Sequence, residues 1–517
     1  MLPRSISMKR LASLAGTAVA ALLLPFFAAC RPRPPAGPLT VAQSSDILTL
    51  DPNARFEVTT DTVAMNIFEP LLRFDSHMTL QPALAVRWET PTDRVWRFHL
   101  RPGVRFHDGS ALSADDVVFT FQRVLKTPES ELFSFLSGIQ EVRAVDAETV
   151  DFVTAQPTSL LARVSVVYVM PRAAFERSGA DAFFRRPVGT GPYSFVSRRP
   201  GESVELEAFP AYWGGRPAVR RVVFRAVESP QERWRLVAAT RPTVLLEAPR
   251  LGWEEHRNDK RFRLVERPSL TVSYLGINCA PRPDNPLADV RVRRAIRAAL
   301  DLKELVRIGT SNHAFPASQY VPPDVIGYNP ALPLPTPDRA AARRLLAAAG
   351  HPDGLDLVLD HHASSTHPTV DEIIRQLAAV GIRVREQSWP TEALYDRIDH
   401  GLSQMHTSGW VCSSGESAEL FQTSLHTRDS RSGLGRGNGL GYSNPELDRL
   451  TELIVTTIDP GSRVELEKRA MAVALEDLPL VPLYIQEDRY AMTPDVLWEP
   501  RADGELWLPD VRLRGGS

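Results

Sequence analysis

The chain alternates strand-like and helix-like segments from residue 39 onward, and this alternation limits its fold more than any other feature. Residues 39–43 form a short apolar run that predicts a strand. Ser113 is followed by two acids and apolar residues at helical spacing, so we expect it to cap a helix that runs to about residue 126.

The second half of the chain continues the pattern. Asp289 predicts the cap of a helix that extends through about residue 306. A further helix is expected from Pro337 to Gly350, and another at 372–380 that leads into a strand at 382–384. Asn444 and Pro445 suit the first positions of a helix. Such alternation predicts the α/β class, and 517 residues suffice for about three domains or lobes.

Charge and composition describe an ordinary globular protein that does not bind nucleic acid. Hydrophobic residues make up 43% of the chain and charged residues 24%, with a formal charge of −2. Residues 1–29 contain three basic residues and no acid, so the remainder carries −5. A weakly acidic body offers no broad basic surface for a nucleic acid.

The N-terminus has the three-part form of an export signal. Basic residues precede an apolar run, and small residues at Ala28 and Ala29 lead directly to Cys30. This end resembles a bacterial lipobox, which implies a signal peptide at 1–29, lipidation of Cys30 and a proline-rich tether at 30–38. Ordinary cleavage near Ala28 is the alternative. We expect an extracytoplasmic or periplasmic protein, anchored to the membrane by lipid.

Catalytic motifs are absent, so no enzymatic activity and no cofactor are expected. The sequence has no GxSxG, HExxH or phosphate-binding glycine loop. His361, His362 and His367 offer metal-ligand chemistry, but we interpret them as part of a Ser/Thr-rich solvated loop. Cys279 and Cys412 are expected to be two buried thiols, with a single disulfide as the alternative.

Nine short motifs, in order along the chain, resemble family 5 extracytoplasmic solute-binding proteins, the dipeptide-, oligopeptide- and nickel-binding components of ABC importers. The most recognisable is Leu100–Gly109 with Ala114–Val117, and four further motifs are Gly189–Tyr193, Tyr212–Gly215, 289–295 and 441–445. The others are Leu50–Pro52, Phe68–Leu72, Gln81–Ala85 with Trp88, and Pro479–Tyr484.

The resemblance implies a two-lobed periplasmic-binding-protein fold of type II, similar to cluster C, with an extra subdomain inserted in the first lobe. Ligand would bind in the cleft between the lobes, which closes by hinge motion. Expected partners are a peptide or other small polar ligand and the membrane permease subunits of an ABC importer, with the binding protein as a monomer. The expected segments are 39–75, 186–270 and 485–517 for lobe I, 76–185 for the subdomain, and 271–484 for lobe II.

One segment departs from the peptide-binding pattern. After Gly409 and Trp410, Ser413 stands where peptide-binding relatives have the Asp that pairs with the peptide's amino group. Glu416 is the nearest replacement, and a surface position for it is equally open. Trp410 would give an apolar wall or pack at the hinge. The expected ligand-contacting residues are Trp410, Ser413, Ser414, Glu416, Asn278 and Tyr442.

The ligand class therefore remains open at this point. Peptides held by their backbone fit the family, whereas nickel, a metal chelate, haem or another polar solute are alternatives. A ligand sensor that does not transport, and an enzyme on this fold, are further alternatives.

Overall fold

The structure is a computed structural model, which describes residues 37–514 apart from 56, 137, 364–366 and 413. The predicted signal peptide, most of the predicted tether, Cys30 and Ser413 lie outside the described residues. None of the helices in the described part of the chain is long and apolar enough to cross a membrane.

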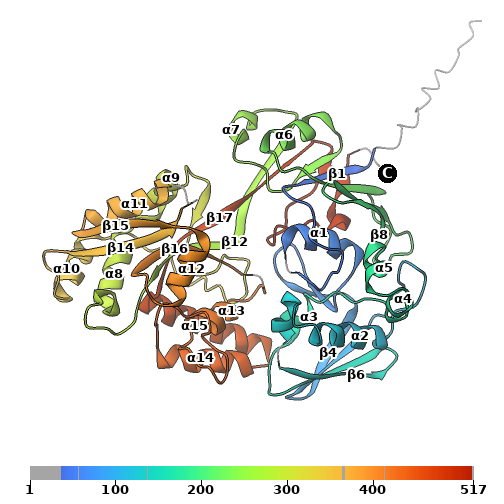
Figure 1. Ribbon diagram of the computed structural model, residues 1–517, viewed down its shortest axis with the longest axis horizontal. Coiled ribbons are helices and arrows are strands. Elements are labelled where there is room, and N and C mark those ends of the chain that lie inside the picture. Colours follow the sequence, from blue (N-terminus) through green and yellow to red (C-terminus); the bar gives the residue numbers. More distant parts are fainter. Residues whose placement is uncertain (1–36, 56, 137, 364–366, 413, 515–517) are drawn as a thin grey trace, which may run out of the picture. The chain divides into compact units, whose positions relative to one another are not determined.

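One mixed sheet of eleven strands is the main sheet of the fold (Figure 1). Its order is β15-β14-β16-β12-β17-β11-β1-β10-β9-β8, and β13 attaches to β17. The strands are β1 (Leu39–Gln43), β8 (Tyr193–Arg199), β9 (Ser203–Ala208), β10 (Arg221–Ala226), β11 (Thr243–Leu245), β12 (Arg263–Ile277), β13 (Ala314–Pro316), β14 (Leu355–His362), β15 (Ile382–Trp389), β16 (Met405–Val411) and β17 (Leu480–Met492).

Two long antiparallel strands, β12 and β17, join the halves of this sheet. Their pairing breaks between Pro268 and Val272, so two ladders lie on either side of an irregularity. The half that contains β1 and β8–β11 covers one hydrophobic core, and the half that contains β14–β16 covers another. The predicted two-lobed α/β architecture is confirmed, because each half of the sheet covers its own hydrophobic core and only β12 and β17 connect the two halves.

The inserted subdomain has its own sheet and core. Its antiparallel order is β4-β5-β7-β6, and Trp96, Phe98, Phe121 and Phe152 pack in its interior. Ser113 caps α2 (Ala114–Leu125) in a capping box with Asp116, as the sequence predicts. The strands are β4 (Ala85–Thr92), β5 (Val95–Leu100), β6 (Ile139–Asp146) and β7 (Thr149–Thr154).

The remaining elements surround these sheets. The helices are α1 (Val58–Ile67), α3 (Leu161–Val164), α4 (Arg172–Ser178), α5 (Ala180–Arg185), α6 (Pro230–Ala239), α7 (Trp253–His256), α8 (Val290–Ala299), α9 (Leu302–Gly309), α10 (Arg339–Ala348), α11 (His367–Ala378), α12 (Thr391–Asp399), α13 (Ala418–Leu420), α14 (Pro445–Thr456) and α15 (Pro460–Asp477). Short two-stranded pairs are formed by β2 (Leu72–Phe74) with β3 (Leu80–Pro82), and by β18 (Val496–Leu497) with β19 (Arg512–Leu513).

Two local predictions were wrong. The helix expected over 289–306 is two helices, because Leu300 is extended and the Asp301 side chain caps α9 through the backbone N–H groups of Lys303 and Glu304. His361 and His362 end strand β14 and do not lie in a loop. The side chain of His367 lies outside the described residues, although its backbone begins α11.

Candidate functional site

A cavity of about 250 Å³ opens among β12, β16, β17, α11 and α12 in the second half of the sheet. Strand β17 contributes Tyr484 and Gln486, which lie two positions apart and therefore face the same side of the strand. The full lining is Ser273, Tyr274, His362, Thr369, Val370, Tyr395, Thr407, Ser408, Gly409, Leu483, Tyr484 and Gln486.

Among the described residues, the lining is polar but contains no Asp, Glu, Lys or Arg. Gln486 donates from Nε2 to Ser273 Oγ at 3.2 Å, and the His362 and Tyr395 rings meet edge to face at 5.6 Å between centroids. Burial raises the pKa of Tyr274 above its usual value, so this phenol stays neutral. The cavity therefore offers hydroxyl, amide and aromatic groups, and suits neutral parts of a ligand.

Strand β16 presents a backbone edge to the cavity. It pairs with β12 along its whole length, from Met405 to Val411, but with β14 only at Met405 and His406. Among the described strands, none pairs with residues 407–411 on the side away from β12. Their outward N–H and C=O groups can pair with an added extended chain.

Gly409 leaves free volume in the cavity beside that edge. A Cβ built on Gly409 would lie 3.4 Å from Thr271 Cγ2 and 3.6 Å from Gln486 Nε2, in ordinary contact. A side chain at this position would begin beside Gln486, with its Cβ 3.7 Å from the Val272 carbonyl oxygen. The missing side chain at Gly409 therefore leaves free volume in the cavity. The backbone conformation at this position does not require glycine.

The charges next to the cavity are compensated within the protein. Asp360, which is fully buried two residues before His362, accepts from Trp389 Nε1 at 3.0 Å and pairs with Arg397 at 3.2 Å. His406 is 2% exposed, and burial lowers its pKa to about 4, so its ring is neutral. Neither group supplies a free charge to a ligand.

Trp410 and Ser414 flank this edge. Trp410 follows Gly409 in β16 and is half-buried against the cluster that contains Cys412 and Phe421. Ser414 N–H donates to Glu419 Oε2 at 3.2 Å. Neither residue lines the cavity itself, and their contact with ligand stays a prediction.

Glu416 lies in a buried ion pair. Its Oε2 is 2.7 Å from Nη2 of Arg463, and the two side chains are 13% and 9% exposed. Arg163, from α3 of the inserted subdomain, also acts on Glu416 electrostatically. Burial and the Glu416 charge together raise the pKa of neighbouring Glu467 to about 8. The Glu416 carboxylate is thus largely buried, and it already has a cationic partner in Arg463.

Asn278 and Tyr442 are buried, and their side chains form hydrogen bonds with other residues of the protein. Asn278 Nδ2 donates to the carbonyls of Gly401 and Ser403, and its Oδ1 accepts from Ala280 N–H. Tyr442 Oη donates to Asp477 Oδ2 at 2.9 Å. Both residues are 3% exposed, so the polar atoms of their side chains serve contacts within the protein.

The two cysteines are free and buried, as the first interpretation predicted, and the alternative disulfide is not formed. Burial raises the pKa of the Cys279 thiol to about 11, which makes the thiolate rare at neutral pH.

Sequence reasoning missed every described residue that lines the cavity. Tyr484 ends the Pro479–Tyr484 motif and Gln486 follows it at strand spacing, and this alternation is the one signal that could have indicated a common face. Tyr274, Tyr395 and His362 come from three separate elements, and no local pattern links them.

Comparison with known proteins places the chain in a family. Residues 79–432 match the bacterial extracellular solute-binding proteins, family 5. The glutathione-binding protein GsiB of Salmonella typhi is 28% identical over 488 residues, which cover 91% of this chain and 93% of the relative.

Solved structures share the fold. HbpA2 from Haemophilus parasuis has a TM-score of 0.83 at 23% identity, covering 92% of this chain and 99% of that one. The periplasmic murein tripeptide binding protein MppA, in its unliganded open form, has a TM-score of 0.80 at 20% identity, covering 92% and 97%. The match over residues 79–432 shows that the chain belongs to the family 5 bacterial extracellular solute-binding proteins.

Proposed function

We propose that this protein is the substrate-binding component of an ABC importer and that it binds peptides through their backbone. The observation that supports this most directly is the unpaired edge of β16 beside the cavity. An extended peptide that adds to this edge satisfies its own N–H and C=O groups while its side chains enter the neutral cavity.

The same residues disfavour recognition of a peptide's two charged ends in this cavity. In the part of the chain that the structure describes, no charged side chain lines it, and Glu416 is already paired with Arg463. A buried ammonium or carboxylate would therefore lack a counter-ion there. Peptides bound mainly by main-chain contacts fit better than dipeptides held at both termini.

We further propose that the protein is a non-catalytic lipoprotein. The described cavity contains hydroxyls and one histidine, but no carboxylate that could orient that histidine as a base. Lipidation of Cys30 would hold the protein near its permease. Mass spectrometry of the N-terminal peptide tests this. Replacement of Cys30 by Ser should release the protein from the membrane fraction, and an unmodified Cys30 would contradict the proposal.

The peptide proposal is tested with the Gly409→Val variant. Purified protein is mixed with pools of di- to octapeptides, and the melting temperature and the bound mass are measured. We expect some pools to stabilise the wild type and Gly409→Val to lose at least about tenfold in affinity, because two methyl groups occupy the cavity beside Gln486.

The control places the same side chain on another strand edge. Ser388→Val lies on exposed β15, outside the cavity, and should bind as the wild type does. If no peptide pool binds while a metal chelate or a haem does, the peptide proposal is wrong. If peptides bind and Gly409→Val binds them equally, the β16 edge is not the site.

A further inference from the structure

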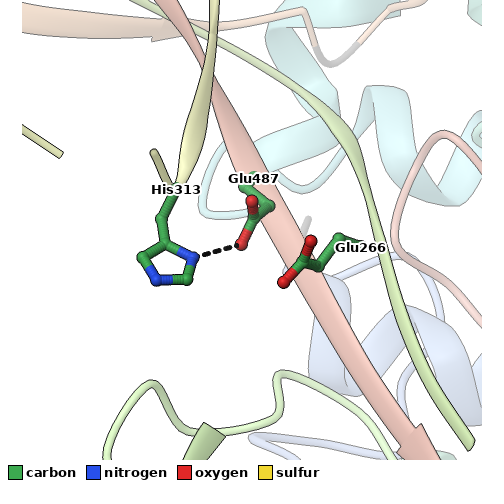
Figure 2. A group of neighbouring side chains, drawn as sticks. All are labelled: Glu266, His313 and Glu487. Carbon is green, nitrogen blue, oxygen red and sulfur yellow. Dashed lines mark hydrogen bonds and ion pairs between the residues drawn. The ribbon is translucent and has the colours of Figure 1, made fainter. Parts of the chain in front are cut away.

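A histidine and two glutamates meet on the strands that join the two halves of the sheet. Glu266 lies on β12, Glu487 on β17, and His313 directly precedes β13 (Figure 2). One possible ligand atom from each lies within 4.8 Å of the others. Figure 2 shows the two carboxylates and the imidazole directed towards a common space.

The cluster is separate from the ligand cavity. Gln486 lines the cavity, and the adjacent Glu487 faces the opposite side of β17, because successive side chains of a strand alternate. Glu266 and His313 likewise do not line the cavity. A ligand at this cluster would not compete with a peptide at the β16 edge.

The cluster has the donor atoms of a first-row metal site. His313 Nδ1 lies 3.2 Å from Glu487 Oε1, so the imidazole and this carboxylate already adjoin one another. The His313 and Glu487 side chains are 10% and 3% exposed. An imidazole with two carboxylates suits Zn²⁺ and similar ions, whereas Mg²⁺ prefers oxygen donors alone.

Neighbouring groups position the carboxylates and leave one oxygen of each available. Trp253 Nε1 donates to Glu266 Oε1 at 2.6 Å, and Arg257 approaches the same oxygen at 3.3 Å. Arg489 contacts Glu487 Oε1 at 3.2 Å. Among the described residues, no donor contacts the Oε2 atom of either glutamate.

The local charge also leaves room for a cation. Glu254 lies 3.7 Å from His313 Nε2, so three carboxylates face the two arginines and a histidine. Three carboxylates against two arginines leave one excess negative charge on these acidic and guanidinium groups. The two arginines weaken the electrostatic attraction between the carboxylates and a divalent ion. The Oε2 atoms of Glu266 and Glu487 are not contacted by these arginines, so the ion can bind to them directly.

We propose that Glu266, His313 and Glu487 bind a divalent first-row cation, with Zn²⁺ as the best fit. The ion would join both central strands to the segment before β13. Three protein ligands leave a fourth position for water.

The test is isothermal titration of the purified, chelator-treated protein with Zn²⁺, Ni²⁺ and Mg²⁺. We expect one equivalent of Zn²⁺ to bind more tightly than Mg²⁺, with a rise in melting temperature. His313→Ala and Glu266→Gln should each weaken Zn²⁺ binding at least about tenfold. Glu266 is 30% exposed, and a glutamine can still accept from Trp253, so Glu266→Gln should fold normally.

His400→Ala is the matched control, because His400 forms an exposed pair with Asp396 at 3.2 Å on α12. It should bind Zn²⁺ as the wild type does. Absence of stoichiometric Zn²⁺ binding, or Zn²⁺ binding that neither His313→Ala nor Glu266→Gln alters, would overturn the proposal. Peptide binding is measured separately and does not depend on this result.

Discussion

At the scale of single residues, the environment of Glu416 decides what this carboxylate does. In the sequence, Glu416 comes three positions after Ser413, which stands where peptide-binding relatives have an Asp. This spacing made Glu416 the candidate to replace that Asp. In the structure it pairs with Arg463, from α15, and both side chains are withdrawn from solvent. A carboxylate that already has a buried cation gains little by binding a ligand ammonium.

We expect Glu416→Gln to lower the free energy of unfolding by about 1–3 kcal/mol and to leave peptide affinity within about twofold. Urea denaturation and titration calorimetry measure the two quantities. Glu465→Gln, on the exposed side of α15, is the control and should stay within about 0.5 kcal/mol of the wild type. Lost affinity with unchanged stability would show that Glu416 contacts the ligand.

His406 gives the protein an acid-sensitive interior. Its pKa is lowered by burial to about 4, below the ordinary 6.5. The unfolded chain therefore takes up a proton at a higher pH than the folded one does. The stability from the neutral ring is complete above pH 6.5 and declines as the pH falls towards 4.

Accordingly, His406→Gln should flatten the loss of unfolding free energy between pH 6.5 and 4, by on the order of 3 kcal/mol over that window. Urea denaturation at several pH values measures it. Burial also lowers the pKa of His107 to about 4. The variant should therefore retain the part of the pH dependence of the unfolding free energy that comes from His107. A variant with the full acid dependence of the wild type would contradict this reading of His406.

At the scale of elements, helix ends depend on single polar side chains. Asp301 accepts from the N–H groups of Lys303 and Glu304, and its own N–H donates to Gln376 Oε1 at 2.6 Å. These contacts start α9 in a new direction after Leu300. Apolar spacing alone runs through this break, which explains why a single helix was expected.

Replacing Asp301 by Ala should cost about 1 kcal/mol of stability, because two backbone donors lose their acceptor. Asp301→Asn keeps an acceptor and should cost a few tenths of that. Chemical denaturation midpoints of the two variants provide the measurement. Equal midpoints for Asp301→Ala and the wild type would mean that the tertiary contact through Gln376 alone sets the break.

At the scale of the whole molecule, two strands connect the halves of the sheet. The β12–β17 ladder is interrupted between Pro268 and Val272, where the backbone has fewer paired groups than on either side. An irregularity in the shared strands is a suitable place for a bend. A ligand that contacts both lobes then favours the closed form by its difference in affinity.

A bound peptide at 100 times its Kd should add about 2.7 kcal/mol to the unfolding free energy. If binding closes the lobes, X-ray scattering should also show a smaller radius of gyration. Gly409→Val at the same peptide concentration should show neither change. A stabilised protein with an unchanged radius would mean binding without closure.

Much of the local structure follows from the sequence by itself. The strand at Leu39–Gln43, the capped helix after Ser113 and the helix after Asn444 form where short-range propensity and capping predict them. The ordered motifs identified the family for the same reason, since turns and caps are fixed by neighbouring residues.

The tertiary structure alone decided the site. Tyr274, His362, Tyr395 and Gln486 meet because β12, β14, α12 and β17 converge, and pairs such as Glu416 with Arg463 join positions far apart in the chain. Local sequence determines backbone conformation, because its forces act over a few residues. Which side chains share a cavity, or neutralise one another, depends on packing between distant segments.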